Sequence, residues 1–208
     1  MKSLGPRSLS SAITTILTIA FYLTILAGVL TTVHGISVLL SGPEQLTVEQ
    51  EVYFKPQPSS YKITPVRAGA AKAGITAAQG VLEVTGVSRA RVLLGLAFDL
   101  FVLALVALAL VNLREVFKTL VGESPFVRDN AARIRRIGFL IIIGEVAHGL
   151  FVFATSRWLV GNFTSTGLTL GSKLEFQLVP FLAGLVLIAI GEVFRLGAAM
   201  KEEQDLTV

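Results

Sequence analysis

The sequence contains no cysteine, only two histidines and few charges, since 15% of its 208 residues are Asp, Glu, Lys or Arg. An ordinary soluble domain has roughly 25% charged residues. Without thiols the chain has no disulfide, no thiolate nucleophile, no iron–sulfur cluster and no cysteine-based zinc site. It also lacks a Gly-x-Ser-x-Gly motif, a His-Glu-x-x-His motif and a phosphate-binding loop. We therefore expect no catalytic residue, no metal site and no cofactor, and we predict that the protein is not an enzyme.

The residues that are abundant are apolar, at 53% of the chain, and the mean hydropathy is +0.73. A helix needs about 20 mostly apolar residues to cross a bilayer. The first apolar run is about twice as long as the core of a secretory signal, which favours an uncleaved anchor. The composition predicts an all-α membrane protein, a four-helix transmembrane bundle with a small extracytoplasmic β-containing lobe. We place the four spans of this single membrane domain at about residues 12–40, 92–113, 137–154 and 178–194.

The distribution of Lys and Arg predicts the orientation of the chain. Segment 114–136 holds six of them in 23 residues, whereas segment 155–177 holds two. Because short loops rich in Lys and Arg stay in the cytoplasm, 114–136 and the tail 195–208 are predicted to be cytoplasmic. Both termini of this multi-pass cell-membrane protein then face the cytoplasm. Segments 41–91 and 155–177 are predicted to be extracytoplasmic.

The extracytoplasmic segments carry strand-like stretches rich in β-branched and aromatic residues or alternating in polarity. Pro56, Pro58 and Pro65 interrupt the longer segment. Paired strands would satisfy backbone groups that lie just outside the lipid. The predicted strands are 48–54, 81–85, 168–170 and 174–176.

Four ionisable residues interrupt the apolar runs and are candidate functional residues, because charge within hydrocarbon is costly. They are Asp99, Glu145, His148 and Glu192. Helical rise places Asp99 and His148 at similar depths, so these two could pair. The simplest interpretation is that the polar groups join the helices by hydrogen bonds. A proton relay through Asp99, Glu145 and His148 and, less favoured, a metal site using Glu145-x-x-His148 are the alternatives. Glu192 is expected to reach the interface beside Arg195.

Two further patterns concern helix packing. Small residues at positions 20, 24, 28 and 32 form a stripe on the first span, which favours packing within the bundle and leaves a homodimer face as the alternative. The sequence Glu-Val-Phe followed by a basic residue ends both the second and the fourth span, at 115–118 and 192–195. This echo is compatible with two repeated helical hairpins.

A cluster of arginines precedes the third span, after Pro125, which is expected to end the preceding helix. The cluster, here called the basic patch, consists of Arg128, Arg133, Arg135 and Arg136. It could set topology and bind anionic lipid, bridge to the acidic tail, or dock a soluble partner. The tail acids are Glu202, Glu203 and Asp205. Direct nucleic-acid binding is not expected, because no recognition motif accompanies the arginines.

Short motifs near the last two spans resemble a known family. They are Glu123-Ser-Pro-Phe126, Asn130, Ile134-Arg-Arg-Ile-Gly138, Glu192-Val-Phe-Arg195 and the tail from Lys201 to Leu206. In order and spacing this set is similar to the bacterial integral membrane proteins of domain of unknown function 2975. The resemblance implies no established activity or cofactor, and implies that members are often encoded beside a small helix-turn-helix DNA-binding protein. We therefore predict a non-enzymatic regulatory or sensing protein that engages a cytoplasmic transcription regulator. The alternative is a small proton-coupled transporter that uses Asp99, Glu145 and His148.

Overall fold

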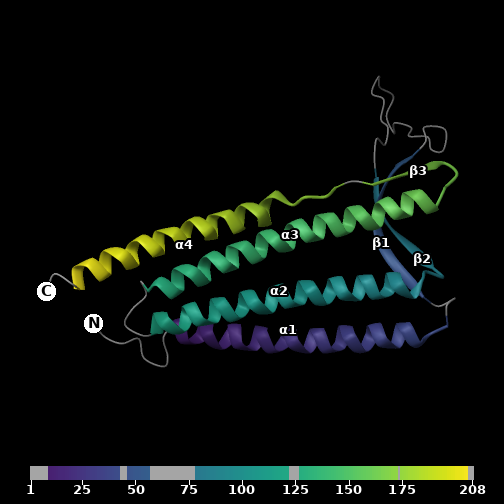
Figure 1. The fold of residues 1–208 in the computed structure, drawn as a ribbon. Coiled ribbons are helices and arrows are strands. Elements are labelled where there is room, and N and C mark those ends of the chain that lie inside the picture. The colour runs from purple at the N-terminus through teal and green to yellow at the C-terminus, as the bar shows by residue number, and fades with distance from the viewer. Residues whose placement is uncertain (1–8, 43–45, 57–77, 122–126, 173, 206–208) are drawn as a thin grey trace, which may run out of the picture. The chain divides into compact units, whose positions relative to one another are not determined.

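The computed structural model describes residues 9–42, 46–56, 78–121, 127–172 and 174–205 (Figure 1). The predicted roles of Pro58, Pro65 and Pro125 and of the motif 123–126 lie outside these residues. Four of the helices are long and apolar enough to cross a membrane, and the chain is a multi-pass membrane protein. The elements in order are α1 (Leu9–Leu40), β1 (Thr47–Pro56), β2 (Ala78–Thr85), α2 (Arg89–Val121), α3 (Arg128–Asn162), β3 (Leu168–Gly171) and α4 (Leu178–Asp205).

Each predicted span lies within one helix, but α2, α3 and α4 extend well beyond the predicted spans. Helix α3 continues past residue 154 to Asn162, although Arg157 interrupts the apolar run. The hydroxyl of Thr155 donates to the carbonyl of Phe151 at 2.8 Å, a local bond that a helix accommodates. A helix does not end where hydrocarbon ends, so hydropathy locates the apolar part of each helix and not its termini.

Many apolar side chains of the helices are exposed on the surface of the chain, including Leu30 at 60% and Val179 at 79%. In water such a surface would be unfavourable. In a bilayer, lipid tails are as apolar as these side chains and cover them. The exposed apolar surface is therefore what four membrane-spanning helices require.

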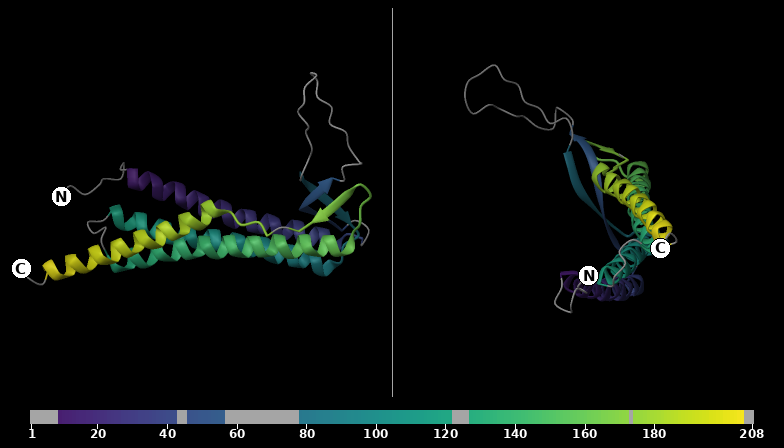
Figure 2. Two further views of the ribbon diagram at one scale, coloured as in Figure 1. Left: turned by 90° about the horizontal axis from the view of Figure 1, so that it is seen from above. Right: turned by 90° about the vertical axis from the view of Figure 1, so that its left-hand side faces the viewer.

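The described residues form two compact units. The first contains most of the four helices, from residues 1–37, 93–146 and 177–208. In this unit α1 lies beside α2 and α3 lies beside α4, as Figure 1 and the right-hand view of Figure 2 show. The hydroxyl of Ser10 donates to the carbonyl of Phe117 at 3.1 Å and links α1 to α2.

The small-residue stripe on α1 has a neighbour in the same unit. A Cβ placed on Gly28 would lie 3.9 Å from a methyl carbon of Leu103 on α2, which is ordinary van der Waals contact. The contact at Gly28 supports the packing interpretation of the stripe. The homodimer remains a prediction.

The closest helix contact is between α3 and α4. A Cβ on Gly138 would lie 2.6 Å from the carbonyl oxygen of Gly184, and a Cβ on Gly184 would lie 2.8 Å from that of Gly138. Seven residues away on each helix, or about two helical turns, a Cβ on Gly191 would lie 3.0 Å from the carbonyl oxygen of Ala131. Small residues let two backbones approach in this way. We call the contact formed by Ala131, Gly138, Gly184 and Gly191 the glycine seam.

The second unit, residues 38–92 and 147–176, contains the strands. They form an antiparallel sheet in the order β2-β1-β3, in which Val52 pairs with Gly80 and Phe54 with Leu170. A Cβ on Gly80 would lie 2.9 Å from the ring of Phe54, so a side chain there would displace the ring. The prediction of a strand at 174–176 is wrong, because this segment forms no strand. It leads directly into α4 instead, so its alternating apolar residues do not reflect strand pairing.

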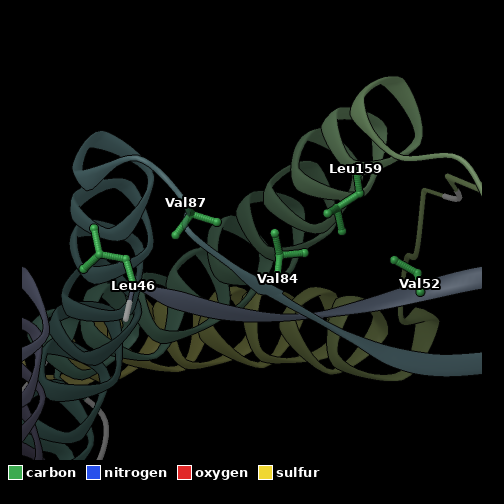
Figure 3. Close-up of a cluster of buried hydrophobic side chains, with 5 residues drawn as sticks. All are labelled: Leu46, Val52, Val84, Val87 and Leu159. Atoms are coloured by element: carbon green, nitrogen blue, oxygen red, sulfur yellow. The ribbon is translucent and has the colours of Figure 1, made fainter. Parts of the chain in front are cut away.

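A small apolar core joins the sheet to the helix ends within the second unit (Figure 3). The ring of Trp158 packs against this core, and the guanidinium carbon of Arg91 lies 3.2 Å from the centre of that ring. A cation over an aromatic face is attracted by the ring's electrons. The contact therefore links the start of α2 to the end of α3. The buried core residues are Leu46, Val52, Val84, Val87 and Leu159.

Candidate functional site

The four ionisable residues of the apolar helices have different environments. Asp99 on α2 is exposed, Glu145 on α3 is buried, and His148 on α3 and Glu192 on α4 are partly buried. No group of three or more His, Cys, Asp or Glu residues able to hold a metal ion is found in the part of the chain that the structure describes. Because their environments differ, the partners of each residue are described separately.

Glu145 has a direct partner at the beginning of α4. Its Oε1 atom accepts a hydrogen bond of 2.5 Å from the backbone N–H of Gln177, the residue immediately before Leu178. The first N–H groups of a helix have no partner within the helix, and a carboxylate near them is favourable. Glu145 therefore caps α4 from the neighbouring helix. The sequence does not indicate this partner, because the bond joins residues that are 32 positions apart.

Asp99 lies on an open face of α2. On the same face, a Cβ placed on Gly95 would have nothing within 4 Å, and Val106 is 43% exposed. Asp99 forms no hydrogen bond or ion pair with any residue that the structure describes. An ionisable group in such a position within an apolar helix is a functional candidate.

Glu192 is held between two arginines. Its Oε1 lies 2.6 Å from Nη2 of Arg195 on the same helix, and its Oε2 lies 3.9 Å from Nη1 of Arg135 on α3. The related motif on α2 forms the same local pair, with Nζ of Lys118 at 2.6 Å from Oε1 of Glu115. Glu192 was expected beside Arg195, and the structure pairs the two; the additional contact with α3 could not be deduced from spacing.

The beginning of α3 and the last turns of α4 bring opposite charges together, and we call this region the basic end. Nη2 of Arg128 lies 2.6 Å from Oε2 of Glu202, so one of the expected bridges to the acidic tail is present. Both side chains are largely exposed, at 69% and 52%. Such a pair is accessible to water and to other molecules.

The basic end also contains a buried polar contact that sequence reasoning missed. Asn130 has 0% exposure, and its Nδ2 donates to Oγ1 of Thr119 on α2 at 2.6 Å. Nη1 of Arg133 donates to Oδ1 of Asn130 at 3.2 Å. Asn130 therefore joins α2 to α3 and fixes one arginine of the basic patch. Its place in the family motif was the only available signal.

Arg136, the last arginine of the basic patch, borders a shallow groove between α2 and α3. The groove has a volume of about 310 Å³ and is almost entirely apolar. Arg136 forms no hydrogen bond or ion pair with the described residues, in contrast to the three other arginines. The groove is lined by Leu108, Asn112, Arg136, Phe139 and Leu140.

These features define a membrane protein with four apolar helices and a group of ion pairs at the basic end. The model of the family described as "Protein of unknown function (DUF2975)" matches residues 58–208. The chain belongs to this family, as its motifs indicated. No curated protein matches the chain, and no solved structure does.

Proposed function

We propose that the chain is a non-enzymatic membrane regulator whose basic end docks a soluble partner. The observation that carries this proposal is the exposed Arg128–Glu202 pair, which joins the beginning of α3 to the end of α4. A partner with an acidic surface can replace Glu202 on Arg128. The helix-turn-helix protein that the family resemblance implies is the proposed partner.

Exchange of this ion pair is energetically easy. An exposed pair contributes only about 0–1 kcal/mol, because water screens both charges. Asn130 meanwhile holds Arg133 from within the protein, so part of the patch stays ordered when the tail leaves. The basic end thus combines an arginine that is held in place, Arg133, with an acidic tail that can be displaced.

The proposal requires the basic end to face the cytoplasm of the cell. Six Lys and Arg residues in segment 114–136 support this orientation. Reporter fusions to the two termini should both give a cytoplasmic signal, whereas a fusion within 41–91 should give an extracytoplasmic one. Termini on opposite faces of the membrane would contradict the proposal.

The partner is tested by co-purification in detergent with a helix-turn-helix regulator from a neighbouring gene. We expect the charge reversal Arg128→Glu to abolish co-purification. It places a second acid beside Glu202, and the two together repel an acidic partner. The double change Arg128→Glu with Glu202→Arg keeps an ion pair but reverses its direction, and it should not restore binding. Arg157→Gln on the same helix is the control and should bind normally. Equal binding by all variants would contradict docking at this site.

A proton-coupled transporter is the second candidate, and it is favoured by Asp99, which is exposed and has no partner among the described residues. Glu145 is held by the backbone of Gln177, so transport would depend first on Asp99. Proteoliposomes with a pH-sensitive dye should then show proton flux that Asp99→Asn abolishes. Flux that is absent, or unchanged in Asp99→Asn, would argue against transport.

A further inference from the structure

The groove between α2 and α3 has a polar end and an apolar end. Arg136 and Asn112 lie on the side of the basic end, and Leu140 and Leu108 each lie one helical turn deeper, about 6 Å along the axis. Phe139 completes the apolar part and is 53% exposed. A charged group at the mouth and an apolar floor match a molecule that has an anionic head and a hydrocarbon chain.

The position of the groove relative to the apolar segments points to a lipid. In α2 the apolar run ends at Leu113, and in α3 it begins at Ile137. Arg136 and Asn112 therefore lie at the level where headgroups meet hydrocarbon, and the leucines lie within the hydrocarbon. Basic residues at this level attract anionic lipids.

Among the described residues, Arg136 differs from the other arginines of the basic patch in its partners. Arg128 binds Glu202, Arg135 lies near Glu192, and Arg133 binds Asn130. Arg136 has no such partner among the residues described. A guanidinium forms paired hydrogen bonds with phosphate, so a phosphodiester suits the unpaired Arg136.

We propose that the α2–α3 groove binds one anionic phospholipid, with its phosphate on Arg136 and an acyl chain along Leu108, Phe139 and Leu140. The volume of about 310 Å³ accommodates part of one chain. The open side leaves the rest of the lipid within the bilayer. This site is independent of the docking proposed for the Arg128–Glu202 pair.

Native mass spectrometry of the detergent-solubilised full chain tests the site. Phosphatidylglycerol and phosphatidylcholine are titrated separately, and the bound fraction is counted per chain. We expect one phosphatidylglycerol to bind about tenfold more tightly than phosphatidylcholine. Arg136→Gln should remove this preference, and the matched control Arg128→Gln should keep it.

Two further measurements test whether the apolar floor of the groove is needed and whether a phosphate without acyl chains can bind. Leu108→Trp fills the apolar floor without changing charge, and it should weaken binding of both lipids. Glycerol phosphate, which has the head without the chains, should not displace bound phosphatidylglycerol. Thermal unfolding in detergent verifies that each variant is folded. If Arg136→Gln does not fold, Leu108→Trp alone tests the site. Equal losses in Arg136→Gln and Arg128→Gln, or displacement by glycerol phosphate, would overturn the proposal.

Discussion

Helices α3 and α4 are held together differently from α1 and α2. At Gly138 the obstacle to a side chain is the carbonyl oxygen of Gly184, whereas at Gly35 it is the side chain of Leu96. A leucine side chain can rotate away, but a helix carbonyl cannot. The α3–α4 contact is therefore a fixed backbone contact, and the α1–α2 contact can adapt.

The largest effect is expected from a single methyl group in the glycine seam. Gly138→Ala places a Cβ where the distance to the carbonyl oxygen of Gly184 is only 2.6 Å, so the helices must separate. We expect the free energy of unfolding to fall by about 3 kcal/mol, the upper part of the range for overpacking. Thermal unfolding in detergent measures the change.

The matched control for this substitution is Gly95→Ala on α2, where the added Cβ would have no neighbour within 4 Å. It should leave the stability unchanged or raise it slightly, because alanine favours helix. If Gly138→Ala and Gly95→Ala unfolded at the same temperature, the glycine seam would not be a fixed contact.

The cap from Glu145 gives the next largest effect. Glu145→Leu leaves the N–H of Gln177 without its acceptor, at an expected cost of about 2 kcal/mol. Glu145→Gln keeps an acceptor oxygen and should lose less. Hydrogen exchange at the Gln177 amide should accelerate in the leucine variant alone. Identical exchange in the two variants would show that the side-chain oxygen does not cap α4.

The hydrogen bond between Asn130 and Thr119 connects the two helix pairs, and its strength can be measured. A double-mutant cycle of Asn130→Ala and Thr119→Ala in detergent should give a coupling energy of about 1 kcal/mol. The bond joins α2 to α3, and Asn130 is fully buried, so water cannot reach its amide freely when Thr119 is removed. Additive losses would indicate that the two side chains act independently.

The smallest effect is expected at Gly28, on the adaptable side of the comparison. Gly28→Ala places a Cβ 3.9 Å from a methyl carbon of Leu103, which is an ordinary contact distance. We expect the change in stability to be within about 0.5 kcal/mol. A loss as large as that of Gly138→Ala would show that α1 and α2 are packed as rigidly as α3 and α4.

The four helices could be predicted because a bilayer imposes one long apolar run on each span. Three of the four predicted strands are also present, as β1, β2 and β3. The exception, 174–176, has the alternation of a strand but leads into α4. Alternation alone does not specify a pairing partner.

The contacts between helices were only partly predictable. The Arg128–Glu202 pair followed from two charge clusters on the same predicted side of the membrane. The partner of Glu145 is a backbone amide, which no residue type can indicate. The small residues of the glycine seam are spaced by seven on α3 and on α4, whereas the stripe on α1 that suggested close packing is spaced by four. Sequence patterns show which helix faces can pack closely, not which helix packs there.

The bond from Glu145 to Gln177 has a consequence for biosynthesis. Helix α4 begins with amides that would be exposed to lipid without an acceptor, which is costly. The acceptor belongs to the preceding helix, so the amide of Gln177 at the beginning of α4 is satisfied only when α3 is already in place. The order in which these two helices leave the ribosome is therefore also the order in which they can mature within the bilayer.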